Sequence, residues 1–166
     1  MRQMTLERLT ADAFRPFGAV ITHDGIDRRS MVAIDGDAGA RPLLWLAKVR
    51  DVVQFPHIFK ALERHPHSSQ TFIPRGDFPH VVVVALGTGT RPDIETVRCF
   101  LATGDQGVTY ARHCWHLGLT PLNAGAEYVV SMVETDAPDQ TVLGELSDEC
   151  AVSFPTIRAQ NGMPEH

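Results

Sequence analysis

The chain has 166 residues, of which 43% are hydrophobic and 21% charged, and its formal net charge at pH 7 is −5. At roughly 100–200 residues per domain, this length predicts a single domain, 1–166, that is large enough to bury a substantial core. Fifteen Lys and Arg stand against 20 Asp and Glu without a basic cluster, which argues against nucleic acid and anionic membranes as partners.

Membrane and secretion signals are missing from the pattern. The longest apolar run, Val81 to Leu86, has six residues, whereas a membrane helix needs about 20. The first five residues lack the apolar stretch of a secretion signal. The cysteines are odd in number and form no CxxC pair, which favours a reducing compartment over a disulfide framework. We therefore expect a cytoplasmic protein.

The first forty residues contain one clear helix signal. Residues 10–14 predict a single helical turn, capped by Thr10 and ended by Pro16 and Gly18. An extended segment is predicted at residues 20–22. The stretch from Asp24 to Arg41 is rich in Gly, Asp and Arg and has little periodicity, so it is either a loop or a set of weak edge strands.

From residue 43 onward the signals are mostly those of strands, separated by Gly, Pro and Asp at short spacings. The predicted strands are Leu43–Val49, Ile58–Arg64, Gln70–Ile73, His80–Leu86, Thr96–Leu101, Gly107–Arg112 and Glu127–Val133. Alternatively, residues 56–62 form a helical turn. A short helical turn is also expected to begin at Asp93. Many short strands with turn residues between them predict a mainly β fold, an antiparallel barrel or sandwich with a few short helices.

The last stretch of the chain, residues 136–166, is polar and interrupted by prolines. One apolar strip, formed by Val152, Phe154 and Ile157, lies within it. We expect this stretch to cross the surface or to reach a neighbouring subunit, and its tail from about residue 155 to be poorly ordered.

The first group of candidate site residues lies near residue 65. If this stretch is a strand, alternation places Glu63 and His65 on one face, together with Phe59, and Arg64 on the other. A returning antiparallel strand then brings Gln70 close to that pair. An imidazole, a carboxylate and an amide oxygen together can hold a divalent ion or a hydroxylated substrate. The competing interpretation is a solvated turn without a site.

A second group lies in residues 107–116. Tyr110, Arg112 and His116 stand at alternate positions, so one strand face can direct all three toward a barrel interior. In the competing interpretation Tyr110 is a core residue. A Cys–His nucleophile at Cys114 is disfavoured, because neighbouring strand residues point to opposite faces.

Together these two groups resemble the cupin superfamily and, within it, the ureidoglycolate lyase family, formerly called ureidoglycolate hydrolase. Glu63-Arg64-His65 stands where cupins usually carry His-x-His, Gln70 stands at the carboxylate position, and His116 stands at the late His position. The resemblance covers about Leu6 to Val133. The matching blocks are Leu-Glu-Arg-His-Pro, Ser-Gln-x-Phe-Ile-Pro, Gln106-Gly107-Val108-x-Tyr110 and Trp115-His116.

The resemblance implies a bicupin-like barrel core, a homodimer and a C–N lyase of the amidine-lyase type. Such an enzyme cleaves ureidoglycolate to glyoxylate and urea in purine (allantoin) degradation, without a nucleotide or redox cofactor. A divalent metal fits the reaction as template and Lewis acid. Mixed N/O ligands suit Ni, Mn or Zn, and the family implies nickel. The expected metal ligands are Glu63, His65, Gln70 and His116.

Roles for the remaining side chains follow from the same reaction. Without a metal, His116 is the expected base, because an imidazole pKa near 6.5 suits neutral pH, and Glu63 orients it or shares the role. Tyr110 donates to the ureido oxygen or only packs. Gln70 also contacts the substrate. The cations expected to hold the substrate carboxylate are Lys48, Arg64 and Arg112, although alternation turns Arg64 away from the site.

Several positions depart from the family pattern. Residues 30–44 differ from it and are shorter, and Lys48 replaces a usual Arg without its bidentate fork. Met132 and Val133 stand where an Asp-Arg pair is usual. Two alternatives therefore stay open: another small-molecule cupin, such as a metal-dependent oxygenase or isomerase, and a non-catalytic ligand-binding cupin.

Overall fold

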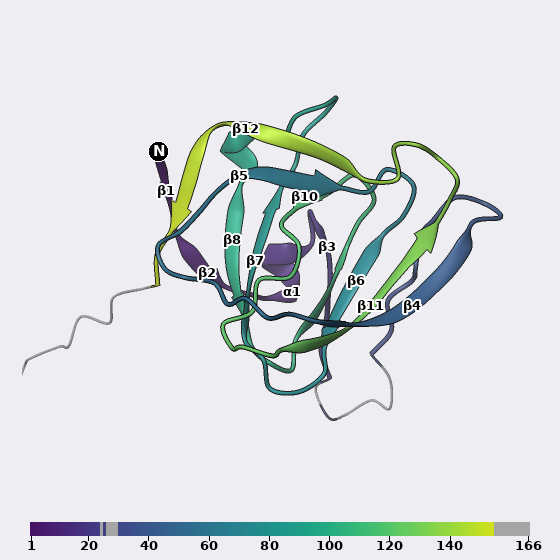
Figure 1. Ribbon diagram of the computed structural model, residues 1–166, viewed down its shortest axis with the longest axis horizontal. Helices are drawn as coiled ribbons and strands as arrows, with labels where there is room; N and C mark the ends of the chain where they lie inside the picture. The colour runs from purple at the N-terminus through teal and green to yellow at the C-terminus, as the bar shows by residue number, and fades with distance from the viewer. Residues whose placement is uncertain (24, 26–29, 155–166) are drawn as a thin grey trace, which may run out of the picture.

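A computed structural model describes residues 1–23, 25 and 30–154, and two β-sheets dominate it (Figure 1). The seven-stranded sheet is ordered β1 (Arg2–Met4), β12 (Val142–Val152), β5 (His57–Arg64), β10 (Trp115–His116), β7 (His80–Ala85), β8 (Arg98–Ala102) and β2 (Leu6–Arg8). The five-stranded sheet is ordered β3 (Gly18–Ile21), β9 (Gly107–Tyr110), β6 (Gln70–Pro74), β11 (Glu127–Glu134) and β4 (Arg41–Lys48). The described helical turns are α1 (Ala11–Phe14) and η1 (Ile94–Thr96). The predicted fold class, mainly β and barrel-like, is confirmed.

One hydrophobic core fills the space between the two sheets. It contains Phe72, Phe100 and Tyr128, together with Val82 and Val84 of β7. The alternate residues of β7, including Val81 and Val83, belong to a second core on the other face. Strand β7 is therefore buried on both faces, which explains its continuous run of four valines.

The second core exists because the seven-stranded sheet curls and is closed by the N-terminus. Strands β1 and β2 are separated only by Thr5, yet β1 pairs with β12 at one edge of the sheet and β2 pairs with β8 at the other. Figure 1 shows β1 at the end of β12 and β2 next to β8. Trp115 and Leu146 fill it, and both are fully buried. Because adjacent strand residues point to opposite faces, Trp115 in this core leaves His116 facing the first.

Most predicted elements are present. Each predicted strand corresponds to an observed strand whose ends differ by at most two residues. The Thr10 hydroxyl accepts a hydrogen bond from the Ala13 amide at 3.2 Å and so caps α1 as predicted. The predicted extended segment at residues 20–22 overlaps β3, and Asp93 caps η1. The alternative helical turn at residues 56–62 is wrong, because residues 57–62 form part of β5.

The main omission is β12, an eleven-residue strand in the stretch expected to cross the surface. Its pairing with β5 shifts register between Glu145 and Cys150, which interrupts the alternation of buried and exposed residues that marks a strand. Strands β1, β2 and β10 were also not predicted, since each has three residues or fewer. The tail from residue 155 lies outside the described residues.

The irregular pairing also corrects the faces assigned to β5. Phe59 and Leu62 both pack in the second core although they are three residues apart, so alternation breaks between them. Placing Phe59 on the same face as Glu63 was therefore wrong. Arg64 lies opposite Glu63 as expected, with its guanidinium 4.6 Å from the centre of the Trp115 ring.

Between Asp24 and Arg41, residues 24 and 26–29 lie outside the description. The described part forms one isolated bridge, from Gly36 to Ser68. Among the described residues, neither helical turn has the length or apolar character needed to span a membrane.

Candidate active site

The structure brings the four predicted metal-ligand residues together at one point in the first core. Glu63 and His116 are direct partners on β5 and β10, and the Glu63 carboxylate oxygen lies 3.6 Å from His116 Nε2. The same oxygen lies 4.0 Å from Nε2 of His65, which follows the end of β5. Gln70 begins β6 and directs its amide oxygen to within 3.0 Å of His116 Nε2. We call these four residues the buried cluster.

Backbone carbonyls determine which ring nitrogen of each histidine faces the cluster. His65 Nδ1 lies 3.1 Å from the Gln140 carbonyl, and His116 Nδ1 lies 3.0 Å from the Cys114 carbonyl. A carbonyl only accepts, so each Nδ1 carries the donated hydrogen. In the neutral rings both Nε2 atoms are therefore lone-pair donors directed toward Glu63.

Burial keeps the His116 ring neutral. The residue is 1% exposed, and desolvation lowers the pKa of its imidazole to about 3. The expectation of an ordinary pKa near 6.5 is wrong for this ring. Tyr110 stacks on it, with ring centroids 4.0 Å apart and planes 9° from parallel. Burial also raises the pKa of the Tyr110 hydroxyl well above its usual value, so this side chain can donate a hydrogen but does not ionise. At neutral pH His116 therefore offers a lone pair.

The donor set of the cluster fits a divalent metal. One suitable atom from each of Glu63, His65 and His116 lies within 4.8 Å of the others. His65 Nε2 is buried and has no hydrogen-bond partner. His116 Nε2 faces the oxygen of Gln70, whose amide nitrogen points to Met132 Sδ at 3.9 Å. Four acceptor atoms without a hydrogen between them are the arrangement that a cation stabilises.

The three predicted carboxylate-binding cations make contacts elsewhere. Arg64 donates to the Gly89 carbonyl and stacks over Trp115. Arg112 bonds the Asp37 carboxylate at 2.6 Å and the Pro66 carbonyl at 2.9 Å. Lys48 is two-thirds exposed, and its ammonium lies 3.4 Å from Glu127.

Arg41 is a cation on the inner face of β4 that the sequence analysis missed. Cross-strand partners place Gln70, Met132 and Leu43 in one row across the five-stranded sheet. Arg41 is paired with Glu134. Arg41 lies two residues from Leu43 on β4, and Glu134 lies two residues from Met132 on β11, so both are on the same face as that row. Lys48 has the opposite parity at the other end of β4. The missed signal was the length of the strand, which was expected to begin at residue 43.

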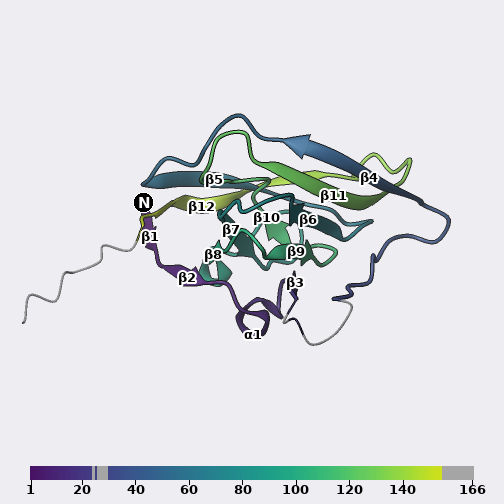
Figure 2. The ribbon, with the colours of Figure 1, turned by 90° about the horizontal axis from the view of Figure 1, so that it is seen from below.

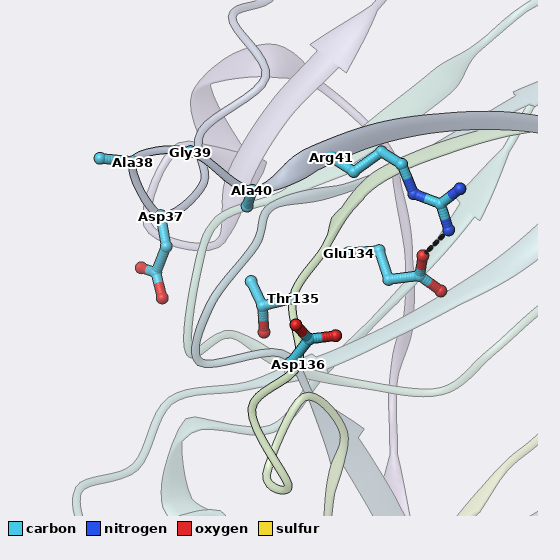
Figure 3. Close-up of a pocket in the computed structure, with 8 residues that line it drawn as sticks. All are labelled: Asp37, Ala38, Gly39, Ala40, Arg41, Glu134, Thr135 and Asp136. Carbon is cyan, nitrogen blue, oxygen red and sulfur yellow. Dashed lines mark hydrogen bonds and ion pairs between the residues drawn. The ribbon is translucent and has the colours of Figure 1, made fainter.

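Arg41 and Glu134 line a cavity of about 540 Å³ formed by residues 37–41 and 134–136 (Figure 3). We call it the mouth cavity. None of the four cluster residues lines it, but Met132, which contacts Gln70, precedes Glu134 by one inward-facing position on β11 and so connects the two regions. Two carboxylates, Asp37 and Asp136, also line the mouth cavity.

Comparison with known proteins places the chain in a family. The family model described as "Ureidoglycolate lyase" matches residues 1–152. A ureidoglycolate lyase of Agrobacterium fabrum is 39% identical over 140 residues, which cover 77% of this chain and 82% of that protein. One of Burkholderia cepacia is 37% identical, over 89% of this chain and 88% of its own length. The chain belongs to the ureidoglycolate lyase family.

Solved structures are more distant from this family member. A complex of the 3,4-ketoisomerase QdtA from Thermoanaerobacterium thermosaccharolyticum aligns with a TM-score of 0.46 at 11% identity, over 75% of this chain and 85% of that one. RmlC from Streptococcus suis aligns with a TM-score of 0.43 at 10% identity, over 60% and 47%. The assignment to the ureidoglycolate lyase family rests on the sequence matches.

Proposed function

We propose that this chain is a ureidoglycolate lyase that cleaves ureidoglycolate to glyoxylate and urea. The observation that supports this most directly is the convergence of the buried cluster, Glu63, His65, Gln70 and His116, in a member of this family. The substrate is a hemiaminal, and its C–N cleavage needs only proton transfer and charge stabilisation.

Glu63 is the cluster residue that meets the substrate. Its side chain is 29% exposed, whereas His65 and His116 are 5% and 1% exposed. One carboxylate oxygen faces the imidazoles, which leaves the other for the substrate hydroxyl. Glu63 takes the hydroxyl proton as the carbonyl of glyoxylate forms and the C–N bond breaks with its electron pair on nitrogen. The same carboxyl then returns the proton to the urea nitrogen. Tyr110 donates a hydrogen bond to the ureido oxygen.

A divalent metal completes the site, and we propose nickel. The two Nε2 atoms of His65 and His116, a carboxylate oxygen of Glu63 and the amide oxygen of Gln70 would hold it. When bound, such an ion polarises the substrate oxygens and lowers the pKa of the hydroxyl. The neutral state of His116 supports this role, since imidazole binds metal only through a free lone pair.

Arg41 is the group that we propose to hold the substrate carboxylate. It lies on the inner face of β4 one row beyond Leu43, about 7 Å farther along the strand. Its ion pair with Glu134 is exposed to water, so exchange of Glu134 for a substrate carboxylate costs little. A guanidinium matches a carboxylate with two parallel hydrogen bonds.

The test of the function is glyoxylate formation from ureidoglycolate by the nickel-loaded protein. Release above the spontaneous rate supports a lyase. Binding without turnover indicates a non-catalytic binding protein, and substrate-dependent oxygen uptake indicates an oxygenase. Either of these results would contradict the proposal.

We further propose that the protein is a cytoplasmic homodimer. The cysteines Cys99, Cys114 and Cys150 are free and buried, as suits a reducing compartment. Strand β4 is an edge strand on the outside of the molecule (Figure 2). Its Leu44 and Leu46 are 72% and 61% exposed, an apolar surface suited to a second copy. Sedimentation of the wild type and of Leu46→Asp tests this: a dimer that the substitution dissociates supports it, and a wild-type monomer contradicts it.

A further inference from the structure

The loop between β11 and β12, residues 135–141, is held against the turn that follows β5. His67 makes this connection: its Nε2 lies 2.8 Å from Asp139 Oδ1, and its Nδ1 lies 2.6 Å from Asp37 Oδ2. Both hydrogen bonds use charged acceptors, which makes them stronger than neutral ones. His67 therefore fastens the loop to a second segment, around Asp37.

The Asp37 end of this connection has its own support. Arg112 bonds the other oxygen of Asp37 at 2.6 Å and the Pro66 carbonyl at 2.9 Å. The Asp37 amide donates to the His67 carbonyl at 3.1 Å. Asp37 is thus held by two hydrogen bonds besides the one to the His67 ring, and Arg112 is itself fixed by the Pro66 carbonyl. The segment whose position depends on the His67 ring is therefore the loop, residues 135–141.

The same loop supplies the partner of a cluster histidine. The residue after Asp139 is Gln140, whose carbonyl accepts from His65 Nδ1 at 3.1 Å. Gln140 is itself braced inside the loop: its side-chain oxygen accepts from the Thr135 amide at 3.1 Å, and its own amide donates to the Ala137 carbonyl at 3.2 Å. Thr141, the last residue of the loop, places its hydroxyl oxygen 3.3 Å from the same Nδ1. Both partners of His65 Nδ1 therefore belong to the loop, so the position of the loop determines whether the hydrogen of His65 resides on Nδ1.

We propose that His67 is a positioning residue that acts through Asp139 and Gln140 to hold His65 in the tautomer with a free Nε2. It does not touch the buried cluster's ligand atoms itself. The inference depends on the proposed function in one respect only: that function uses the lone pair of His65 Nε2 to bind a divalent metal. Groups that orient a metal-binding histidine typically change metal affinity by 10–100-fold when removed.

The experiment compares Asp139→Ala, which removes the acceptor, with Asp139→Asn, which keeps an oxygen for His67. The first readout is the tautomer of His65 in the metal-free protein, from two-bond 1H–15N NMR correlations assigned with His65→Gln. The second is nickel affinity by calorimetry. We expect Asp139→Ala to show mixed tautomers and about 10–100-fold weaker nickel binding, and Asp139→Asn to stay within about threefold of wild type.

A single Nδ1-protonated tautomer of His65 in Asp139→Ala would overturn the proposal, as would unchanged nickel affinity in that variant. His67→Leu serves as a second variant that breaks the same connection from the other side, and the same results are expected of it. The tautomer measurement needs no substrate. A protein that forms no glyoxylate but shows the tautomer change would lose the proposed function and keep this inference.

Discussion

The buried cluster and the mouth cavity share no lining residue, and they differ in their exposure to water. In the cluster the His65 and His116 side chains are at most 5% exposed, and burial lowers the pKa of His116 to about 3. At the mouth, Arg41 and Glu134 are 73% and 40% exposed, and their ion pair is surrounded by solvent. Electrostatic interactions are strong in the first environment and weak in the second. The exposed cavity therefore suits recognition, and the buried cluster suits chemistry.

The largest expected effect comes from the cluster. His116→Ala removes a buried lone-pair donor and the ring on which Tyr110 stacks, and we expect turnover to fall by at least about 100-fold. Steady-state glyoxylate release measures this, with His57→Ala, outside both regions, as the control. Wild-type turnover in His116→Ala would mean that the reaction does not depend on the buried cluster.

Removal of the metal is the next test. If the cluster residues hold an ion, dialysis against a chelator lowers turnover by at least about tenfold, and added nickel restores it. After the same treatment, the His116→Ala variant should bind added nickel too weakly to measure. Full activity after verified metal removal would assign the reaction to the protein side chains alone.

A smaller effect, on binding, is expected at the mouth. Arg41→Gln keeps a hydrogen-bond donor but loses the charged fork, so KM should rise about tenfold while kcat changes less than threefold. The matched control is Asp136→Asn, which lines the same cavity and should change neither constant by more than about twofold. An unchanged KM in Arg41→Gln would exclude Arg41 as the carboxylate partner.

The smallest effect concerns stability and uses His80, a buried histidine outside the cluster. His80 is 3% exposed, and burial lowers its pKa below the ordinary 6.5, so the unfolded chain takes up a proton that the folded chain resists. This contribution to stability is present above pH 6.5 and is lost as pH falls toward the folded pKa. The loss approaches about 1.4 kcal/mol per pH unit for one proton.

Urea unfolding at pH 7.5 and pH 5 measures that loss. His80→Gln should be less stable at pH 7.5 but should lose less stability between the two pH values than the wild type. Equal losses in the two proteins would mean that folding does not lower the pKa of His80, which would contradict the effect expected from its burial.

Most of the longer strands and the residues of the buried cluster were accessible from sequence because they depend on local patterns. Alternation around Glu63 and His65 and the turn before Gln70 involve neighbours in the chain, and the chain alone specifies them. Membership of two separated stretches in one site came from resemblance to a family. Arg41 escaped notice because the strand signal began two residues late.

Other features depended on contacts between distant segments. The closure of the seven-stranded sheet needs β1 and β2 to pair with strands about 150 and 90 residues away, and β12 becomes a strand only against β5. The low pKa of His116 is likewise a consequence of burial, which no local pattern states. What the amino-acid sequence determined by itself was the reactive groups of the buried cluster and the opposite strand faces of Glu63 and Arg64. The tertiary structure decided which of them lost water, because desolvation is a property of the packed neighbours.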